Sequence, residues 1–204
     1  MYVEPFPRRV RGYRGDDVVI DSDHVLLVHR AGQPPTYAFP SGDVSPDLPA
    51  ADVTADEDAP GHVRVLWDAM DSWYEEEEQV FGHPRNPYHR IDCVPTRRRL
   101  RVEVAGAVLV DTDATIGLYE TSLAPKLYVE RAQVRTDLLV PSATTTYCPY
   151  KGTASWFHAV VGEVTVDDVA WSYEDPLSES TPIRGLLSFE PLRTTLTHDL
   201  PTSA

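Results

Sequence analysis

The sequence predicts a mainly β protein built from two related small antiparallel units, and three observations support this prediction. The chain has 204 residues, 42% of them hydrophobic and 25% charged, which is ordinary globular composition. Short apolar stretches alternate with turn residues along most of its length, as in strands joined by tight turns. The third observation is a repeat: residues 8–23 read RRVRGYRGDDVVIDSD, and residues 98–113 read RRLRVEVAGAVLVDTD.

The repeat has a constant offset of 90 residues and continues without a gap as far as Val44 and Val134. Identical residues at this offset include Arg8, Arg9, Arg11, Val18, Asp21 and Asp23 of the first copy. We interpret this as an internal duplication of one β unit, with residues 1–95 as the first repeat and 96–204 as the second. Coincidence between strand-like segments is the alternative.

Each copy opens with a predicted β-hairpin whose turn contains a glycine, Gly15 in the first and Gly106 in the second. A turn with two aspartates follows. The next strands are expected at 24–30 and 36–39 in the first copy, and at 115–120 and 126–129 in the second. This order predicts that each unit begins as an antiparallel meander.

After these strands the copies differ. In the first, residues 45–60 are rich in Ala, Pro and Asp and predict a flexible loop. Residues 65–81 place Trp67, Met70, Trp73 and Val80 near helical spacing, with the acidic run 75–78 between them. This pattern predicts one amphipathic helix with its acidic residues on the solvent face.

In the second copy the strand pattern continues. Residues 154–161 and 164–171 predict a hairpin across the turn at Gly162-Glu163. Residues 183–189 predict a last strand or short helix. Beyond Pro191 the Thr-rich sequence predicts an irregular tail.

Charge and composition exclude several classes of protein. The net charge of −14 disfavours binding to nucleic acid or to an anionic membrane surface. We find no apolar run long enough to span a membrane and no signal-peptide pattern at the N-terminus. Cys93 and Cys148 form no disulfide framework, and no Cys-x-x-Cys or His-x-x-x-His pair indicates a zinc site. We therefore expect a cytoplasmic protein without a structural metal.

Residues 146–156, TYCPYKGTASW, concentrate reactive and aromatic groups, and residues 171–176, WSYEDP, form a second such cluster. Lys151 is suited to binding an anionic group or, if its pKa falls on burial, to acting as a nucleophile. Gly152 would let backbone N–H groups approach an anion. The structural alternative is a lysine paired with Glu120 or Asp175.

We take Lys151 and Glu120 as candidate catalytic residues, with Glu120 orienting the lysine or a ligand hydroxyl. The candidate ligand-binding residues are Tyr147, Cys148, Tyr150, Gly152, Trp156, Trp171, Tyr173 and Asp175. The aromatic residues either stack on a planar ligand or form core, and Cys148 is either a nucleophile or a buried inert thiol. A role for Glu174 or Asp175 as a base or metal ligand stays open beside a simple turn.

The order Cys-Pro-Tyr-Lys-Gly-Thr-Ala-Ser-Trp (148–156), then Trp-Ser-Tyr-Glu-Asp-Pro (171–176), resembles the family of domains of unknown function 427. That family is also catalogued under a nucleotidyltransferase-like name. The stretch 67–90 looks like the longer, tandem members, so the resemblance covers nearly the whole chain. It implies a small β fold of the tent or half-barrel type, used twice. The first copy lacks the lysine motif, so a site built on that motif would occur once per chain.

We therefore expect a protein that binds a small anionic or planar ligand in a lysine and aromatic pocket of the second repeat. Whether it is an enzyme, and with what cofactor, stays open. One alternative is a nucleotidyltransferase-like enzyme. Another is a non-enzymatic interaction module that uses the acidic helix at 75–78. We expect a monomer, because the second copy can supply the contact that a single-copy relative would gain by dimerising.

Overall fold

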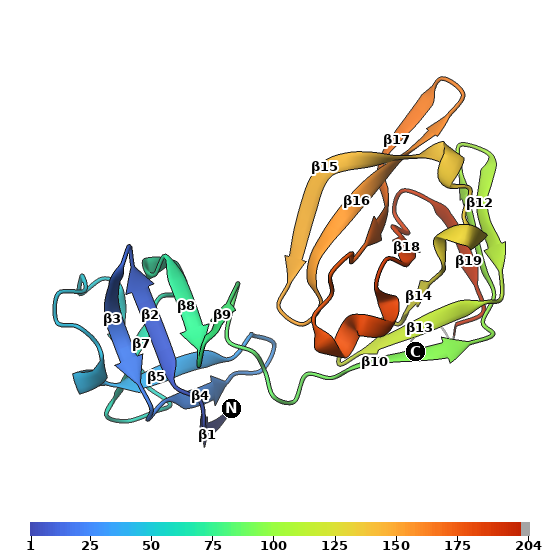
Figure 1. The fold of residues 1–204 in the computed structure, drawn as a ribbon. Helices are drawn as coiled ribbons and strands as arrows, with labels where there is room; N and C mark the ends of the chain where they lie inside the picture. Colours follow the sequence, from blue (N-terminus) through green and yellow to red (C-terminus); the bar gives the residue numbers. More distant parts are fainter. Residues whose placement is uncertain (201–204) are drawn as a thin grey trace. The chain divides into compact units, whose positions relative to one another are not determined.

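The computed structural model describes residues 1–200, which form two compact units. The first unit is residues 1–87 and the second begins at Tyr88. Both are mainly β with antiparallel pairing, and none of the five sheets in the described residues closes into a barrel (Figure 1). Residues 88–95, which the repeat boundary assigned to the first copy, lie in the second unit because Ile91–Thr96 pairs there.

The first unit has two sheets. The five-stranded sheet has the order β1 (Tyr2–Pro5), β4 (Leu26–His29), β5 (Thr36–Pro40), β7 (His62–Val65), β6 (Val53–Ala55). The four-stranded sheet has the order β3 (Asp17–Ser22), β2 (Val10–Arg14), β8 (Ser72–Glu75), β9 (Glu78–Val80). Two 3-10 turns, η1 (Ser41–Asp43) and η2 (Trp67–Ala69), connect strands.

The meander prediction is wrong for both units. Strands β3 and β4 are consecutive in the chain but belong to different sheets. The chain crosses between the sheets at residues 23–25, and Val25 is 1% exposed, so the connection itself enters the core. The predicted loop at 45–60 is also partly ordered, because β6 pairs with β7 and Asp56 is buried.

The predicted amphipathic helix is wrong as well, since residues 72–80 form the hairpin of β8 and β9. Burial alternates along β8, with Trp73 and Glu75 inside, as in a strand with one buried face. Glu76 has φ 51°, a left-handed turn residue that ends β8. Residues 76–78 of the acidic run are exposed as predicted, although on a hairpin and not on a helix. Glu75 is the exception, because its buried carboxylate accepts hydrogen bonds from Arg8 at 2.5 Å and Tyr37 at 2.6 Å.

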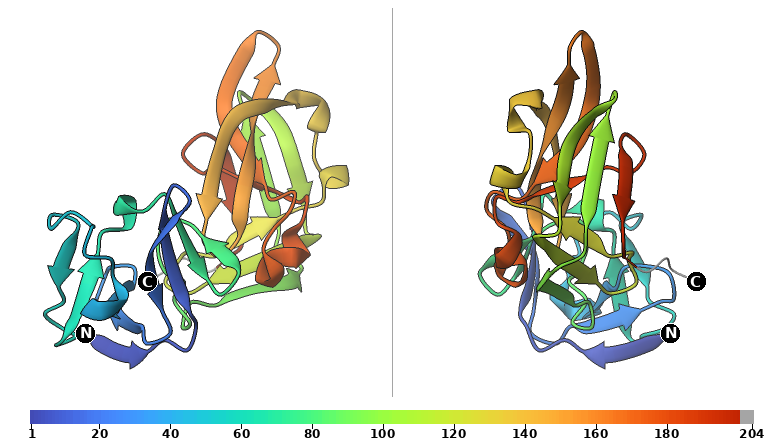
Figure 2. Two further views of the ribbon diagram at one scale, coloured as in Figure 1. Left: turned by 60° about the vertical axis from the view of Figure 1, so that its left-hand side comes forward. Right: turned by 90° about the vertical axis from the view of Figure 1, so that its right-hand side faces the viewer.

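The second unit has three sheets. Their orders are β10 (Ile91–Thr96), β13 (Thr115–Glu120), β14 (Lys126–Tyr128); β12 (Ala107–Thr112), β11 (Leu100–Val104), β19 (Thr195–His198); and β15 (Leu139–Cys148), β16 (Gly152–Val161), β17 (Val164–Ser172), β18 (Leu187–Phe189). Short 3-10 helices are η3 (Arg131–Gln133), η4 (Thr136–Leu138) and η5 (Ser178–Ile183). The turn between β16 and β17 extends beyond the rest of its unit in all three views (Figures 1 and 2).

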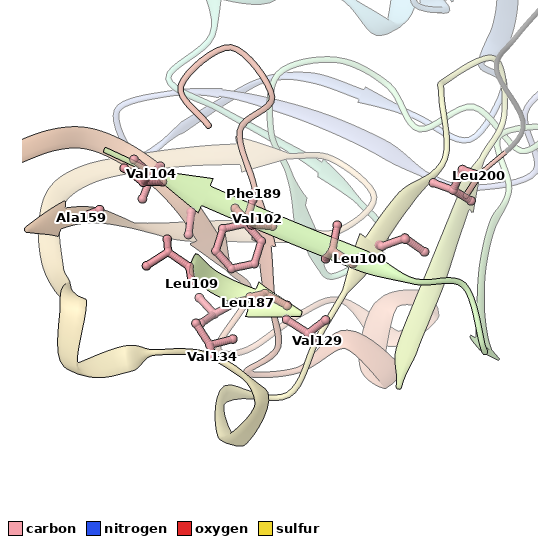
Figure 3. Packing of buried hydrophobic residues seen from close by; sticks show 14 residues of the cluster. Leu100, Val102, Val104, Leu109, Val129, Val134, Ala159, Leu187, Phe189 and Leu200 are labelled. Atoms are coloured by element: carbon pink, nitrogen blue, oxygen red, sulfur yellow. The ribbon is translucent and has the colours of Figure 1, made fainter. Parts of the chain in front are cut away.

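The predicted strands and hairpin of this unit are confirmed, with β13 at the predicted residues. The Thr-rich tail is not irregular, however, because β19 pairs with β11. The larger core packs between these sheets (Figure 3). Leu100, Val102 and Val104 alternate inward from β11 toward Phe189 of β18, and all four are at most 3% exposed.

Equivalent residue pairs recur in the two units at the 90-residue offset. Val10 pairs with Ser22 in the first unit, and Leu100 pairs with Thr112 in the second. Both hairpins carry a bulge at the same step, after Gly12 and after Val102. The 90-residue offset also relates the pairing of β1 with β4 to that of β10 with β13. It relates the bridge Ile20–Val44 to the bridge Val110–Val134 as well. In the first unit the β6–β7 hairpin takes the place in the chain order that the β15–β16 hairpin takes in the second, but its strands are shorter.

Candidate functional site

The hairpin loop between β15 and β16 fixes the position of Lys151. Three residues, 149–151, connect the strands, and Cys148 pairs with Gly152 at the closing position. The Lys151 N–H donates to the Cys148 carbonyl at 3.2 Å, and Gly152 has φ +92°. A turn followed by a left-handed glycine is typical of a three-residue hairpin loop. The Leu177 N–H also donates to the Lys151 carbonyl at 3.1 Å, which holds the loop against the following segment.

Lys151 is buried, with the residue 8% exposed. Its Nζ lies 2.5 Å from Oε2 of Glu120, whose side chain is 7% exposed. The other Glu120 oxygen, Oε1, lies 2.9 Å from Nε2 of His89. The imidazole of His89 stacks on the Tyr150 ring, with centroids 3.9 Å apart and an interplanar angle of 19°. Glu120 therefore bridges two basic groups, and we call Lys151, Glu120 and His89 the Lys151 cluster.

Buried phenols lie near this cluster. Tyr128 and Tyr173 belong to one apolar group with Trp171, whose indole Nε1–H donates to the Tyr128 hydroxyl at 3.0 Å. Burial raises the pKa of both tyrosines, and the charge of Glu120 adds a smaller contribution in the same direction. Burial likewise raises the pKa of the Cys93 thiol, so this cysteine stays protonated at neutral pH.

The structure brings together only part of the predicted residue set. Lys151, Glu120 and Tyr150 are linked through His89, while Trp171 and Tyr173 lie in the buried group as core. Cys148 is half-buried at the end of β15. Gly152 shapes the loop.

Of the other three predicted ligand residues, Trp156 packs on the same buried group, with its ring centroid 5.2 Å from that of Trp171, whereas Asp175 and Tyr147 are exposed. The Asp175 side chain is 89% exposed and pairs with Arg184 at 3.1 Å. Tyr147 is 41% exposed. Trp156 donates to Thr146 and lines a separate cleft of about 320 Å³ with Asp168 and Arg193, among others.

The sequence did not indicate His89, Tyr128 or Cys93. His89 is not among the predicted site residues, and its approach to Glu120 depends on the pairing of Ile91 with Glu120 between β10 and β13. The motif around Lys151 carries no sign of this partner. Cys93 and Tyr128 lie on strands whose positions were predicted, but the pattern does not distinguish them from other core residues.

Two clefts of the second unit lie away from Lys151. One, of about 560 Å³, is lined by Ile116, Tyr128 and Glu130, among others. Lys151 lines neither this cleft nor the one beside Trp156. Within residues 1–200 no three His, Cys, Asp or Glu side chains gather as a metal site, and no helix is long and apolar enough to cross a membrane.

Comparison with known proteins gives a family for the second unit. The model of a domain of unknown function, DUF427, matches residues 92–199, just over half of the chain. The chain belongs to the DUF427 family. The DUF427 match runs from β10 to β19, so it contains Lys151 and Glu120, and His89 lies just before it. A search of curated proteins gives no match.

Proposed function

We propose that the DUF427 domain of this chain binds a small anionic ligand at the Lys151 cluster. One observation carries the proposal. A lysine ammonium has three N–H donors, and among the described residues only Glu120 accepts from Lys151. Since the residue is 8% exposed, bulk water has little access to the other donors. An oxygen of an anionic ligand would supply a missing acceptor.

The energetics of burial support a functional role. Moving an ammonium and a carboxylate out of water costs several kcal/mol per ion, and their attraction often only offsets this. Apolar side chains of similar size would serve stability equally well. The chain has only two lysines, and one of them is placed here. Desolvated titratable groups that pair in this way mark candidate functional sites.

Each member of the cluster has a role in this proposal. Lys151 supplies positive charge to the ligand, and Glu120 holds the ammonium in place through Oε2. Through Oε1, Glu120 also lies within hydrogen-bond distance of Nε2 of His89. The carboxylate thus positions an ammonium and an imidazole side by side, and both can donate N–H groups to an anion.

Thermal shift measurements with inorganic phosphate, citrate and ATP test this function. A ligand that binds the folded state raises Tm by mass action. We expect a shift in wild type and in Lys126→Met, which removes the other lysine, and no shift in Lys151→Met. The double variant Lys151→Met/Glu120→Gln should recover stability over Lys151→Met but not binding, because it removes both buried charges. Equal shifts in all four proteins, or none in wild type, would contradict the proposal.

The nucleotidyltransferase-like alternative has no geometric observation in its favour and stays a prediction. Calorimetry with ATP, with and without Mg²⁺, tests it: binding that requires Mg²⁺ would support it over simple anion binding. The interaction module built on an acidic helix is withdrawn, because β8 and β9 replace that helix. Cytoplasmic location and a monomeric state also stay predictions, the second testable by analytical ultracentrifugation.

We also infer that the two units arose by tandem duplication of a DUF427-like domain. The shared offset of strand pairs, bulges and bridges supports this inference. The ion pairs Arg9–Asp21 and Arg99–Asp111 recur at the same offset. In this view the lysine motif in the β15–β16 loop is a feature of the second copy alone, and one chain has one anion site.

A further inference from the structure

The first unit contains a cleft of about 330 Å³ that is independent of the Lys151 cluster. Its volume lies in the range of small-molecule sites in proteins. Its lining includes Pro34, Tyr37, Arg64, Leu66, Trp67 and Trp73. Most of this lining is aromatic or aliphatic, and Leu66 is 48% exposed at the surface.

The aromatic rings of the lining pack against one another. The rings of Trp67 and Trp73 stack with centroids 5.1 Å apart and an interplanar angle of 21°, and Tyr37 lies 6.3 Å from Trp67 at 30°. The Trp73 indole N–H donates to the Trp67 carbonyl at 2.9 Å, and the Tyr37 hydroxyl donates to Glu75 at 2.6 Å. The inner polar atoms are thus satisfied, which leaves preformed aromatic surface.

Arg64 and Trp67 of the lining carry side-chain N–H donors without an acceptor among the described residues. The Arg64 guanidinium, on β7, makes no ion pair or hydrogen bond within residues 1–200, although the chain is strongly acidic. The indole Nε1–H of Trp67 likewise has no acceptor there. A guanidinium binds a planar carboxylate through paired N–H donors. A ligand that fits this cleft therefore carries acceptor oxygens next to a flat apolar group.

We propose that this cleft binds a planar aromatic carboxylate. The ring of the ligand packs on Trp67, and its carboxylate accepts from Arg64. This site does not depend on the function proposed for the second unit, because all of its lining residues lie within residues 33–84.

Protein-observed NMR tests the proposal with benzoate and its neutral analogue benzamide as probes. The chain has four tryptophans, so its spectrum holds four indole N–H signals, and Trp67 and Trp73 belong to this cleft. We expect benzoate to move the signal of Trp67 and leave those of Trp156 and Trp171 in place. Arg64→Gln should weaken benzoate binding about tenfold, the loss of one charge-assisted interaction, and weaken benzamide binding much less, because a neutral carbonyl makes no charge-assisted bond.

Arg14→Gln is the matched control, because Arg14 is an exposed arginine of the same unit outside the cleft. It should bind benzoate as wild type does. Benzoate that moves no signal of Trp67 or Trp73, or that binds equally well to Arg64→Gln, would overturn the proposal. The NMR spectrum of each variant also reports whether the unit is folded.

Discussion

Lys126 and Lys151 are the two lysines of the chain, and their surroundings differ. Lys151 is buried in an ion pair, whereas Lys126 is half-exposed, with its Nζ 5.7 Å from the Trp171 ring centroid. We predict that an acetylating reagent modifies Lys126 well before Lys151, because a buried, paired ammonium must leave its carboxylate to react. Peptide mass spectrometry over a time course measures both rates. Equal rates would mean that Lys151 is not held as described.

The conformation of Gly152 makes a second prediction at this scale. At φ +92° a side chain is strained, and an added Cβ would lie 3.5 Å from the Asp175 carbonyl oxygen. Gly152→Ala should therefore lower the free energy of unfolding by about 1–2 kcal/mol. Gly42→Ala is the control, because Gly42 has open space around it and no positive φ. Urea denaturation of both variants gives the comparison, and equal stabilities would refute the strain argument.

Individual residues were predictable where the chemistry was local. The sequence indicated Lys151 and gave Glu120 as one of its two possible partners, and the structure selects Glu120 over Asp175. It did not indicate His89. That contact depends on how β10 aligns with β13, and such a register is set by packing of the whole sheet rather than by neighbours in the chain.

At the scale of elements, β19 gives the clearest prediction. It covers the edge of β11 in the sheet, and Leu196 and Leu200 pack on the larger core. A chain that ends at residue 193 should fail to fold its second unit, because it loses this strand and both leucines. Dispersion in the NMR spectrum reports the outcome, and a fully dispersed spectrum would contradict it. Leu192→Ser, at a residue 94% exposed, should fold normally.

Strands were predicted well where apolar alternation was regular, as in β13, β16 and β17. The sequence failed at residues 67–80. Large apolar residues spaced by three (Trp67, Met70 and Trp73) fit a helix, yet they also fit a turn followed by a strand, and the pairing of β8 with β2 decided the outcome. The sequence also did not predict that β3 and β4 belong to different sheets. The Asp-Ser-Asp turn between them is compatible with pairing of the two strands and with a crossing to a second sheet.

Buried tyrosines make a prediction for the molecule as a whole. Burial raises the pKa of Tyr37 in the first unit and of Tyr128 and Tyr173 in the second. A raised pKa means that the folded state holds the phenolic proton after the unfolded chain has lost it. Stability is therefore unaffected below about pH 10, the pKa of an unfolded tyrosine, and falls above it by about 1.4 kcal/mol per pH unit for each such group.

Urea denaturation from pH 8 to pH 11.5 measures this loss. Tyr37→Phe should remove the part of this stability loss that comes from the first unit, because phenylalanine has no proton to lose. An unchanged slope in that variant would show that Tyr37 ionises in the folded state. Tyr2→Phe, at a residue 52% exposed, is the matched control and should keep the wild-type slope.

The four apolar clusters also predict how the chain divides. Two of them use only residues up to Trp73, and two use only residues from Ile91 onward. A fragment of residues 88–204 should therefore fold alone with a cooperative urea transition, since a unit with its own core needs no other. Circular dichroism and NMR check this. A fragment that is unfolded in native buffer would mean that its core is not sufficient.

The 90-residue offset places Arg30 of the first unit at the position of Glu120 in the second. Arg30 pairs with Asp56 and Asp58, whereas Glu120 pairs with Lys151 and His89, so the same corner of the fold holds opposite charges in the two units. Replacing Arg30 or Glu120 alone would leave the charge of its partner without a counter-charge at a site that little water reaches. Across relatives, residues 120 and 151 should therefore covary, and so should residues 30 and 56.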